Sequence, residues 1–315
     1  MHAPKKSVDV FIGIFGKPYQ TALSLLSLLR HSGEYIDRIY FLEEPATPEM
    51  ERHDHRRLLE YLGDRVIRFM PAHWLGPEVV DEKRILHDEA YRLSVRYQYG
   101  WEQSDKTFAL IIHNDIEVTG DIVGELLGNI GEATAIGGIG QCWWCPAGQK
   151  GLCSPTTYES YRPDYEELMR LYREDVDLTS RRAYHLGLRS EFHDRAWPLP
   201  ECRLNEWGVL LNLDKARPAT LPLGPAAPYG AIFASGAKIG PNRDQDVELD
   251  IGVSWFRDMT HLGHTFAHYP VERFITHARQ GHCALFDPEL YIRKELEAKL
   301  LLLKHYPEYA SGASG

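Results

Sequence analysis

An apolar run at residues 108–112 ends on three polar side chains, His113, Asn114 and Asp115, and Glu117 follows two positions later. A strand that ends on a carboxylate places it at the rim of a sheet, where ligands of α/β proteins bind. A divalent cation such as Mg²⁺ or Mn²⁺ binds carboxylates together with phosphate oxygens, and it neutralises charge on a leaving diphosphate. The pattern therefore indicates a metal site at Asp115. The alternative is a solvated strand-to-turn junction, because Asn and Asp favour turns in any protein.

Cys142, Cys145 and Cys153 follow a C-x2-C-x7-C spacing in a segment rich in Gly and Pro. The two cysteines of a C-x2-C pair often coordinate tetrahedral zinc as thiolates, so one interpretation is a structural Zn²⁺ bound by these three side chains. The sequence has no second C-x2-C pair, and Cys202 is the fourth cysteine in the neighbourhood. Buried or free thiols are therefore the other interpretation.

Two aromatic segments of the second half could bind a sugar ring. Trp143 and Trp144 lie between the first two cysteines, and flat indole faces suit sugar rings. Asn205 and Trp207 belong to a polar and aromatic segment at residues 202–207. We predict that these four side chains line a sugar-binding site, with burial in the core as the alternative for the aromatic ones.

The first half of the chain alternates between apolar, β-branched runs and segments with leucines at helical spacing. Strands are predicted at Val8–Phe15, Ile36–Leu42, Val66–Met70, Phe108–Ile112 and Thr134–Ile139, and helices at 19–31, 48–62, 82–103 and 121–129. This order predicts an α/β fold with a mostly parallel sheet and helices on both faces. Three of the strand ends carry polar pairs, Gly16-Lys17, Glu43-Glu44 and Asn114-Asp115, and are expected to meet at one edge.

The second half is less regular, beginning with a stretch rich in Cys, Gly, Pro and Tyr at residues 141–163. Helices are predicted at 164–183, 205–216, 245–262 and 288–305, and strands at Ala231–Ser235, Phe266–Tyr269 and Arg273–His277. No linker separates the two halves, so residues 1–315 are expected to form a single domain with an irregular lobe over the strand ends.

Residues 111–118 resemble the DXD-type metal motif of GT-A fold glycosyltransferases, in particular the family-2-like transferases. Further segments match that family in the same order along residues 8–283: Arg96–Gly100, Gly230–Ser235, Asp244–Leu249, and then Tyr269-Pro270, Ile275–His277 and Gly281-His282. Tyr97 and Gln245 depart from the family pattern, where Asn and Glu are usual. The order of these segments carries the resemblance.

The resemblance implies a nucleotide-sugar donor bound with Mn²⁺ or Mg²⁺. It implies residues 1–140 as the nucleotide-sugar-binding half and residues 141–315 as the acceptor-side half, which ends in the C-terminal helix. The metal ligands would be Asp115, Glu117 and His277. The donor would be bound by Gly16, Glu43, Glu44, Arg96, Asn114 and Asp115. The sugar predicted at Trp143, Trp144, Asn205 and Trp207 would then be the acceptor.

Asp246 matches the general base of inverting members of that family. It would deprotonate the acceptor hydroxyl as that oxygen attacks the anomeric carbon, a task suited to a well-placed carboxylate. Because Asp246 begins a predicted helix, capping of that helix is the alternative.

Composition narrows the classes of protein. The 315 residues carry a formal net charge of −10, which argues against non-specific nucleic-acid binding. No stretch approaches the roughly 20 apolar residues that a membrane helix needs, and the short apolar run after Lys5 and Lys6 lacks a signal-peptide pattern. A cytoplasmic protein is therefore expected.

The leading hypothesis is a metal-dependent, inverting glycosyltransferase. It leaves the acceptor open among a glycan, a lipid-linked sugar, a metabolite and a protein side chain. One alternative is a nucleotidyltransferase on a similar sheet, which would want a Gly-rich loop with Lys or Arg after the first strand. The other is a non-catalytic binding or scaffold protein, which the departures at Tyr97 and Gln245 leave open.

Overall fold

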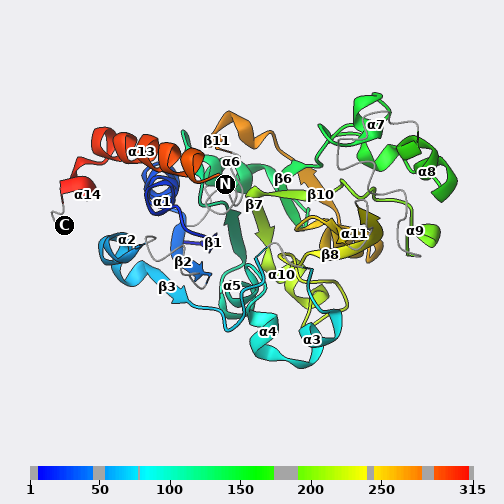
Figure 1. Cartoon of the computed structure of the whole chain (residues 1–315), viewed down its shortest axis with the longest axis horizontal. Coiled ribbons are helices and arrows are strands. Elements are labelled where there is room, and N and C mark those ends of the chain that lie inside the picture. The colour runs from blue at the N-terminus through cyan, green and yellow to red at the C-terminus, as the bar shows by residue number, and fades with distance from the viewer. Residues whose placement is uncertain are drawn as a thin grey trace.

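The computed structural model describes residues 6–44, 54–76, 79–173, 191–239, 245–278 and 287–311. Its centre is a seven-stranded sheet that draws strands from both halves of the chain (Figure 1). The strands are β1 (Val8–Ile14), β2 (Ile36–Glu43), β3 (Val66–Phe69), β4 (Phe108–Ile112), β6 (Ala135–Ile139), β7 (Leu204–Asn212) and β10 (Phe266–His268). They lie in the order β10-β6-β7-β4-β1-β2-β3.

The sheet is mostly parallel. Neighbouring strands pair in parallel from β4 through β1 and β2 to β3, and again between β6 and β10. β7 lies between β4 and β6 and runs antiparallel to both. The predicted α/β class with a mostly parallel sheet is thereby confirmed. Two short pairs accompany the sheet: β5 (Ile116–Val118) with β11 (Ile275–His277), and β8 (Phe233–Ile239) with β9 (Gln245–Leu249).

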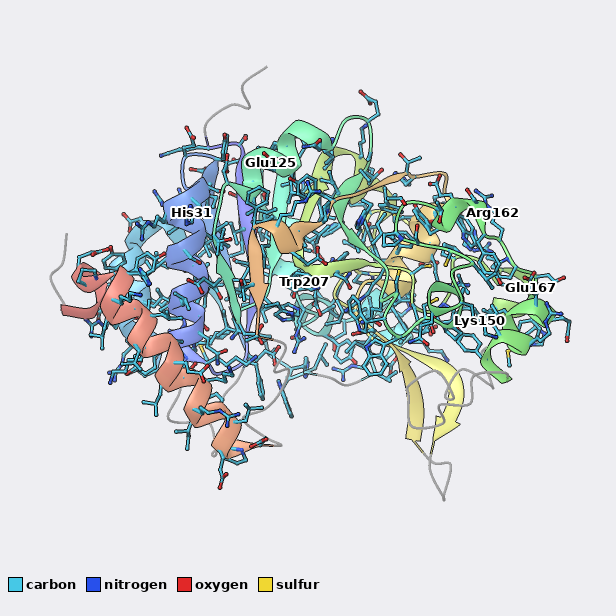
Figure 2. The ribbon with its side chains drawn as sticks, turned by 90° about the horizontal axis from the view of Figure 1, so that it is seen from above. His31, Glu125, Lys150, Arg162, Glu167 and Trp207 are labelled. Carbon is cyan, nitrogen blue, oxygen red and sulfur yellow. The ribbon has the colours of Figure 1, made fainter. Side chains whose placement is uncertain are left out.

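Helices cover both faces of the sheet. They are α1 (Pro18–Ser32), α2 (Arg56–Leu62), α3 (Glu82–His87), α4 (Glu89–Leu93), α5 (Gln98–Gln103), α6 (Ile122–Asn129), α7 (Pro146–Gln149), α8 (Tyr165–Arg173), α9 (Glu191–Asp194), α10 (Leu213–Ala216), α11 (Val253–His261), α13 (Pro288–His305) and α14 (Pro307–Ser311). α7 and α8 lie at the end of the molecule opposite to α13 and α14 (Figure 1). From above, Trp207 lies in the middle, whereas Lys150 and Glu167 mark the far end (Figure 2).

Alternation along β1 shows why the sheet has two cores. Val10 and Ile12 face one side, where they belong to the same apolar cluster as Leu25 of α1 and Ala298 of α13. Phe11 faces the other side and joins the cluster that contains Trp101 of α5. All of these side chains are buried, so burial on both faces explains why this strand is apolar apart from Asp9.

The prediction of one long helix at residues 82–103 is wrong, because the structure divides this segment into α3, α4 and α5. The Asp88 carboxylate accepts a hydrogen bond from the Tyr91 amide and so starts a new helix at α4. Tyr97 then adopts a left-handed conformation with φ of 68°, which separates α4 from α5. The break leaves Arg96 in a β-bridge with Gly230.

Two further helix predictions are corrected. Residues 204–212 form β7, because this short buried run fills the space between β4 and β6, and periodicity alone does not separate such a strand from a buried helix. Residues 245–249 form β9 rather than the start of a helix, and α11 begins only after Gly252, whose φ is 83°. Of the helix predicted at 48–62, the structure describes only α2, because residues 45–53 lie outside the described residues. Of the helix predicted at 164–183, residues 174–183 also lie outside them.

No helix among the described residues is long and apolar enough to cross a membrane.

Candidate metal centre and cleft

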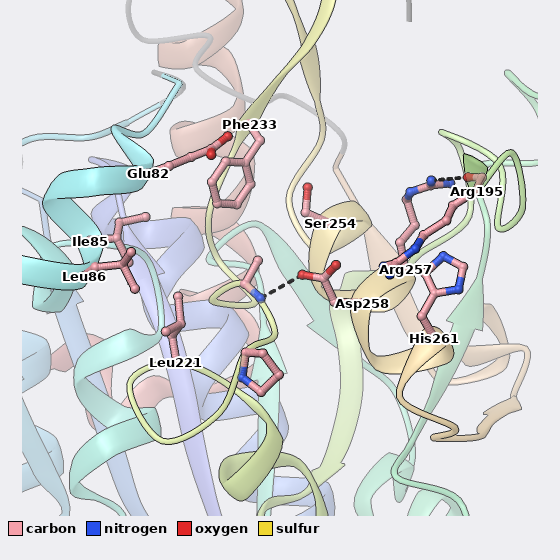
Figure 3. A pocket seen from close by; sticks show the side chains of 12 residues that line it. Glu82, Ile85, Leu86, Arg195, Leu221, Phe233, Ser254, Arg257, Asp258 and His261 are labelled. Atoms are coloured by element: carbon pink, nitrogen blue, oxygen red, sulfur yellow. Dashed lines mark hydrogen bonds between the residues drawn. The ribbon is translucent and has the colours of Figure 1, made fainter. Parts of the chain in front are cut away.

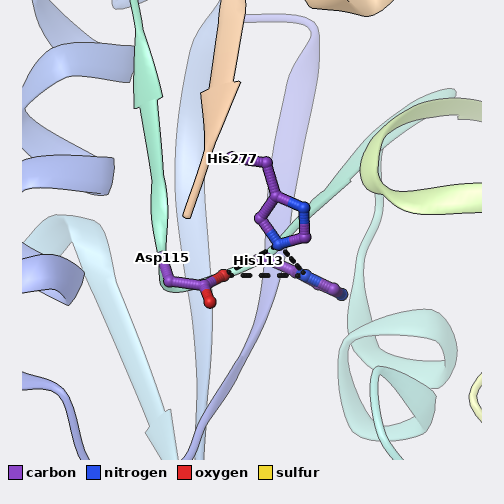
Figure 4. A group of neighbouring side chains, drawn as sticks. All are labelled: His113, Asp115 and His277. Carbon is purple, nitrogen blue, oxygen red and sulfur yellow. Dashed lines mark hydrogen bonds and ion pairs between the residues drawn. The ribbon is translucent and has the colours of Figure 1, made fainter. Parts of the chain in front are cut away.

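Three potential metal ligands meet where β4 ends (Figure 4). His113 and Asp115 follow β4 directly, and His277 arrives from β11, which pairs with β5 so that His277 lies opposite Ile116. His277 Nε2 lies 3.1 Å from Asp115 Oδ1 and 3.1 Å from His113 Nδ1. His113 Nδ1 lies 3.7 Å from the same carboxylate oxygen.

These separations fit one shared cation. Two donors in adjacent coordination positions, each about 2.1 Å from a metal, lie about 3 Å apart. Two imidazoles and one carboxylate suit a transition metal better than Mg²⁺, which prefers a shell of oxygen ligands. The donor set therefore fits Mn²⁺ or a similar ion more closely than Mg²⁺.

A buried carboxylate contacts His113 on the ring nitrogen that faces away from Asp115 and His277. Glu206 of β7 lies with its Oε1 atom 3.0 Å from His113 Nε2, and its Oε2 atom accepts a hydrogen bond of 2.8 Å from the Tyr97 hydroxyl. A metal-binding histidine usually donates its second ring N–H to such a carboxylate, which directs the other nitrogen at the metal. Burial would raise the pKa of Glu206, but His113, Arg203 and Arg96 hold that pKa well below its ordinary value. Glu206 is therefore a carboxylate that can accept this N–H.

Trp207 supports the second histidine. Its indole ring stacks on the imidazole of His277 at a centroid distance of 5.4 Å and an interplanar angle of 12°. Trp207 is buried, and one face of its indole ring packs against His277. Burial lowers the pKa of His277 below its ordinary value, which favours the neutral form that binds metals.

The third potential ligand, Asp115, is paired with a lysine. Lys17 Nζ donates a hydrogen bond of 2.9 Å to Asp115 Oδ2 inside the protein. Burial would raise the pKa of Asp115, but the Lys17 ammonium and the hydrogen bond with His277 hold it well below its ordinary range. Asp115 is thus ionised at neutral pH.

The loop between β1 and α1 closes this side of the site. Gly16 has a φ of 60°, which glycine adopts without strain, and its carbonyl accepts hydrogen bonds from Asn114 Nδ2. Asn114 Nδ2 also donates to the Thr21 hydroxyl. Asn114 therefore clamps the loop that carries Lys17, in addition to lining the cleft.

A second charged pair lies at the end of β2. Glu44 accepts hydrogen bonds from Arg96 Nε at 2.8 Å and from Trp74 Nε1 at 2.9 Å. The Trp74 ring stacks on Phe15, with centroids 5.9 Å apart. Glu43 points elsewhere, to Arg68 on the neighbouring strand β3. The polar ends of β1, β2 and β4 therefore lie at one edge of the sheet, as their places in the sequence predict.

The three potential metal ligands, together with Lys17, Arg96 and Glu206, line a cleft of about 450 Å³, whereas the predicted donor residues Gly16, Glu43 and Glu44 are not among its lining residues. Its rim includes Trp143 and Trp144, whose side chains are 44% and 39% exposed. Asn205 is not among its lining residues: it is buried, and its Nδ2 atom donates to the carbonyls of Gly138 and Gly140. The four predicted acceptor residues thus differ: Trp143 and Trp144 are exposed at the rim, Trp207 lines the cleft while it stacks on His277, and the Asn205 amide is buried.

Two carboxylates that were predicted for the site, Glu117 and Asp246, lie in the two short strand pairs beside the main sheet. Glu117 lies in β5 and is not part of the His113–Asp115–His277 group. Its charge contributes to raising the pKa of Tyr306, which follows α13. Asp246 lies in β9, opposite Lys238 of β8, and its side chain is outside the part of the structure that is described. The carboxylate that lines the cleft from this region is Asp250, which accepts a hydrogen bond from Gln141 Nε2 and pairs with Arg203.

The four cysteines at 142, 145, 153 and 202 line one small cavity near α7. All four are free thiols. A hydrogen bond to Cys153, together with burial, raises the pKa of Cys145, and burial raises the pKa of Cys142 to about 11. Among the described residues, no three of their sulfur atoms come as close together as the donors at Asp115. Zinc at Cys142, Cys145 and Cys153 remains a prediction.

A second cavity, of about 350 Å³, lies between α3 and α11 (Figure 3). Ile85, Leu86 and Phe233 give it an apolar side, and Asp258 accepts a hydrogen bond from the Ala227 amide beside it. None of the residues that line it lines the cleft at Asp115. The metal-ligand group and this cavity are therefore separate features.

No protein-family model matches this chain, and no curated protein matches it in sequence. Among solved structures, it is similar to a mannosyltransferase from Pyrobaculum calidifontis, with a TM-score of 0.41, 8% identity, and coverage of 96% of this chain and 78% of that one. Glucosyl-3-phosphoglycerate synthase from Mycobacterium tuberculosis gives a TM-score of 0.40, 10% identity, and coverage of 95% and 78%. A galactosyltransferase in complex with donor and acceptor sugar analogs gives a TM-score of 0.34 and 12% identity. The match covers 66% of this chain and 59% of that protein. At these TM-scores the function has to be argued from the site.

His113 is a potential ligand that sequence reasoning missed. Its place two residues before Asp115 is visible in the sequence, but only the folded structure brings it to Asp115, His277 and Glu206.

Proposed function

We propose that this chain is a metal-dependent glycosyltransferase that moves a sugar from a nucleotide-sugar donor to an acceptor hydroxyl. The observation that carries the proposal is the group of His113, Asp115 and His277 at the carboxyl edge of a mostly parallel sheet, with cationic side chains beside it. A divalent cation held there would supply charge neutralisation for a leaving diphosphate. Ligands of such sheets bind at this edge, which supports the assignment.

The charge of the cleft favours a metal–diphosphate complex. Among the described residues, the charged side chains that line it are Lys17, Arg96 and Arg203 against Asp115, Glu206 and Asp250. With both histidines neutral, these charges balance. A nucleotide sugar has a doubly negative diphosphate, so together with a divalent cation it adds no net charge to the cleft. A bare cation or a bare diphosphate would each leave an uncompensated charge in a partly buried site.

Trp143 and Trp144 are proposed to hold the acceptor, because they are exposed at the rim of the same cleft and ring faces suit sugars. The general base is proposed to be Asp246, with Asp250 as the alternative because Asp250 lines the cleft. Transfer with inversion remains part of the proposal. The acceptor stays open among a glycan, a lipid-linked sugar, a metabolite and a protein, and the location in the cytoplasm also remains a proposal.

The donor set supports one second candidate. Two histidines and one carboxylate with further positions open are also the ligands of non-haem Fe(II) oxygenases. That reading predicts Fe(II) binding with no dependence on nucleotides, whereas the glycosyltransferase proposal predicts coupling between metal and nucleotide.

The test is thermal unfolding of the purified chain with UDP-, GDP- and dTDP-sugars, with Mn²⁺, Mg²⁺, Fe²⁺ or no metal. A ligand at a hundredfold over its Kd stabilises the fold by about 2.7 kcal/mol, which raises the Tm of a chain of this length by about 4 °C. We expect a Mn²⁺-dependent shift with one nucleotide that is lost in Asp115→Asn. The matched control is Glu117→Gln, a carboxylate two residues away that lies outside the ligand group and should keep the shift. Stabilisation by Fe²⁺ alone, unchanged by every nucleotide, would favour the oxygenase candidate instead.

A further inference from the structure

We infer that Lys17 makes the donor group at Asp115 accept a divalent cation far better when that cation is already bound to a diphosphate. Lys17 would thereby set the order in which the cleft fills, so that metal and nucleotide enter together. This inference rests on the proposed function of the same site and extends it to the regulation of metal binding.

The two oxygens of Asp115 have different partners. Oδ2 accepts the hydrogen bond from Lys17 Nζ at 2.9 Å, whereas Oδ1 faces His277 Nε2 at 3.1 Å and His113 Nδ1 at 3.7 Å. With the ammonium on Oδ2, the oxygen that faces the two imidazoles is Oδ1. Lys17 therefore directs Asp115 to bind a metal through one oxygen.

The position of Lys17 is built into the fold. Lys17 adopts a left-handed conformation with φ of 56° and ψ of 53°, which is uncommon for a residue with a side chain and persists where the surroundings enforce it. Its amide donates to the Tyr291 hydroxyl of α13. In the same helix, Glu295 accepts hydrogen bonds from the amides of Tyr19 and Gln20. α13 thus holds the first turn of α1, and with it the Lys17 side chain, against Asp115.

The electrostatic consequence follows from charge. The only formal charge among the three metal ligands is the Asp115 carboxylate, and Lys17 already neutralises it in a buried environment. A bare divalent cation would meet a site without net negative charge and an ammonium nearby, which opposes binding. A cation bound to a diphosphate brings negative charge with it, and the Lys17 ammonium can then face phosphate oxygens as well as Asp115.

The experiment measures Mn²⁺ affinity directly, by the electron paramagnetic resonance signal of free Mn²⁺, with no nucleotide and with saturating UDP or GDP. Wild type should bind bare Mn²⁺ weakly and bind it much more tightly with one nucleotide. Lys17→Met should bind bare Mn²⁺ at least about tenfold more tightly than wild type, because the opposing charge is gone. Its gain in Mn²⁺ affinity on adding nucleotide should shrink by a similar factor. Lys17→Arg keeps the charge and should behave as wild type.

The outcomes separate the inference from the function. Bare-Mn²⁺ affinity that is equal or lower in Lys17→Met, with the fold intact by circular dichroism, would overturn the role of Lys17 even if nucleotide still strengthens metal binding in wild type. If no nucleotide strengthens Mn²⁺ binding in any variant, the proposed function fails, and with it the coupling. Should Lys17→Met not fold, Lys17→Gln retains a hydrogen bond to Asp115 without the charge and decides the same comparison.

Discussion

Replacing Glu206 with glutamine should weaken metal binding about ten- to hundredfold while the fold stays in place. Glu206 Oε1 lies 3.0 Å from His113 Nε2, and this contact leaves His113 Nδ1 facing Asp115 and His277. A glutamine can present its amide nitrogen to the ring instead, which would favour the wrong tautomer of His113. The expected loss corresponds to about 1.4–2.7 kcal/mol of binding free energy.

The structure also limits what this substitution does to stability. Removing the negative charge affects Arg203 and Arg96, which both lower the pKa of Glu206. Each keeps another carboxylate, because Arg203 pairs with Asp250 at 3.2 Å and Arg96 with Glu44 at 2.8 Å. The variant should therefore lose about 1–3 kcal/mol of unfolding free energy, the range for one disturbed buried hydrogen bond, and remain folded.

Isothermal titration calorimetry with Mn²⁺ in the presence of saturating UDP or GDP measures the metal affinity, and urea unfolding measures the stability. The matched control is Tyr97→Phe, which removes the other hydrogen bond of Glu206 but leaves the carboxylate on His113. We expect Tyr97→Phe to keep Mn²⁺ affinity within about threefold of wild type, since the partner of the ligand is unchanged. A folded Glu206→Gln variant with wild-type Mn²⁺ affinity would refute the role given to Glu206 and remove the main reason to count His113 as a ligand.

Three further predictions follow from other contacts. Trp207→Leu removes the ring stack on His277, so Mn²⁺ affinity in calorimetry should fall about two- to tenfold, whereas Trp207→Phe should retain it; equal losses in both would argue against stacking. Gly230→Ala places a Cβ atom 2.0 Å from the Arg96 carbonyl oxygen, so urea unfolding should show a loss of more than about 2 kcal/mol in unfolding free energy. Gly128 lies in a helix with open space around it, so Gly128→Ala should leave the unfolding free energy unchanged or raise it. Similar losses in both variants would contradict this prediction. Burial lowers the pKa of His277, so its contribution to stability is complete above its ordinary pKa near 6.5 and is lost as the pH falls through the lowered value. The Tm of His277→Gln should therefore fall less than that of wild type between about pH 7 and pH 5, and parallel curves would exclude this contribution.

Local patterns in the sequence were enough to predict the frame of the site. β4 and β6 are uninterrupted apolar runs, and β1 and β2 are apolar apart from Asp9 and from Asp37-Arg38 and the final Glu43. Such runs form buried parallel strands where helices cover both faces of a sheet. Polar residues at their carboxyl ends then have to meet at one edge, which is why Lys17 and Asp115 come into contact. Asp115 could be chosen as a candidate from its residue type and its place after a strand, and His277 from the family resemblance.

The tertiary structure decided which side chains face the cleft and which do not. The periodicity of residues 205–216 predicts a helix, but residues 204–212 form β7 between β4 and β6. This antiparallel pairing places the Glu206 carboxylate at His113 and buries the Asn205 amide against Gly138. The register of β5 with β11 brings His277 to Asp115. These outcomes depend on strand pairings between residues far apart in the chain, and a one-residue shift would turn each side chain to the opposite face, so no local pattern specifies them.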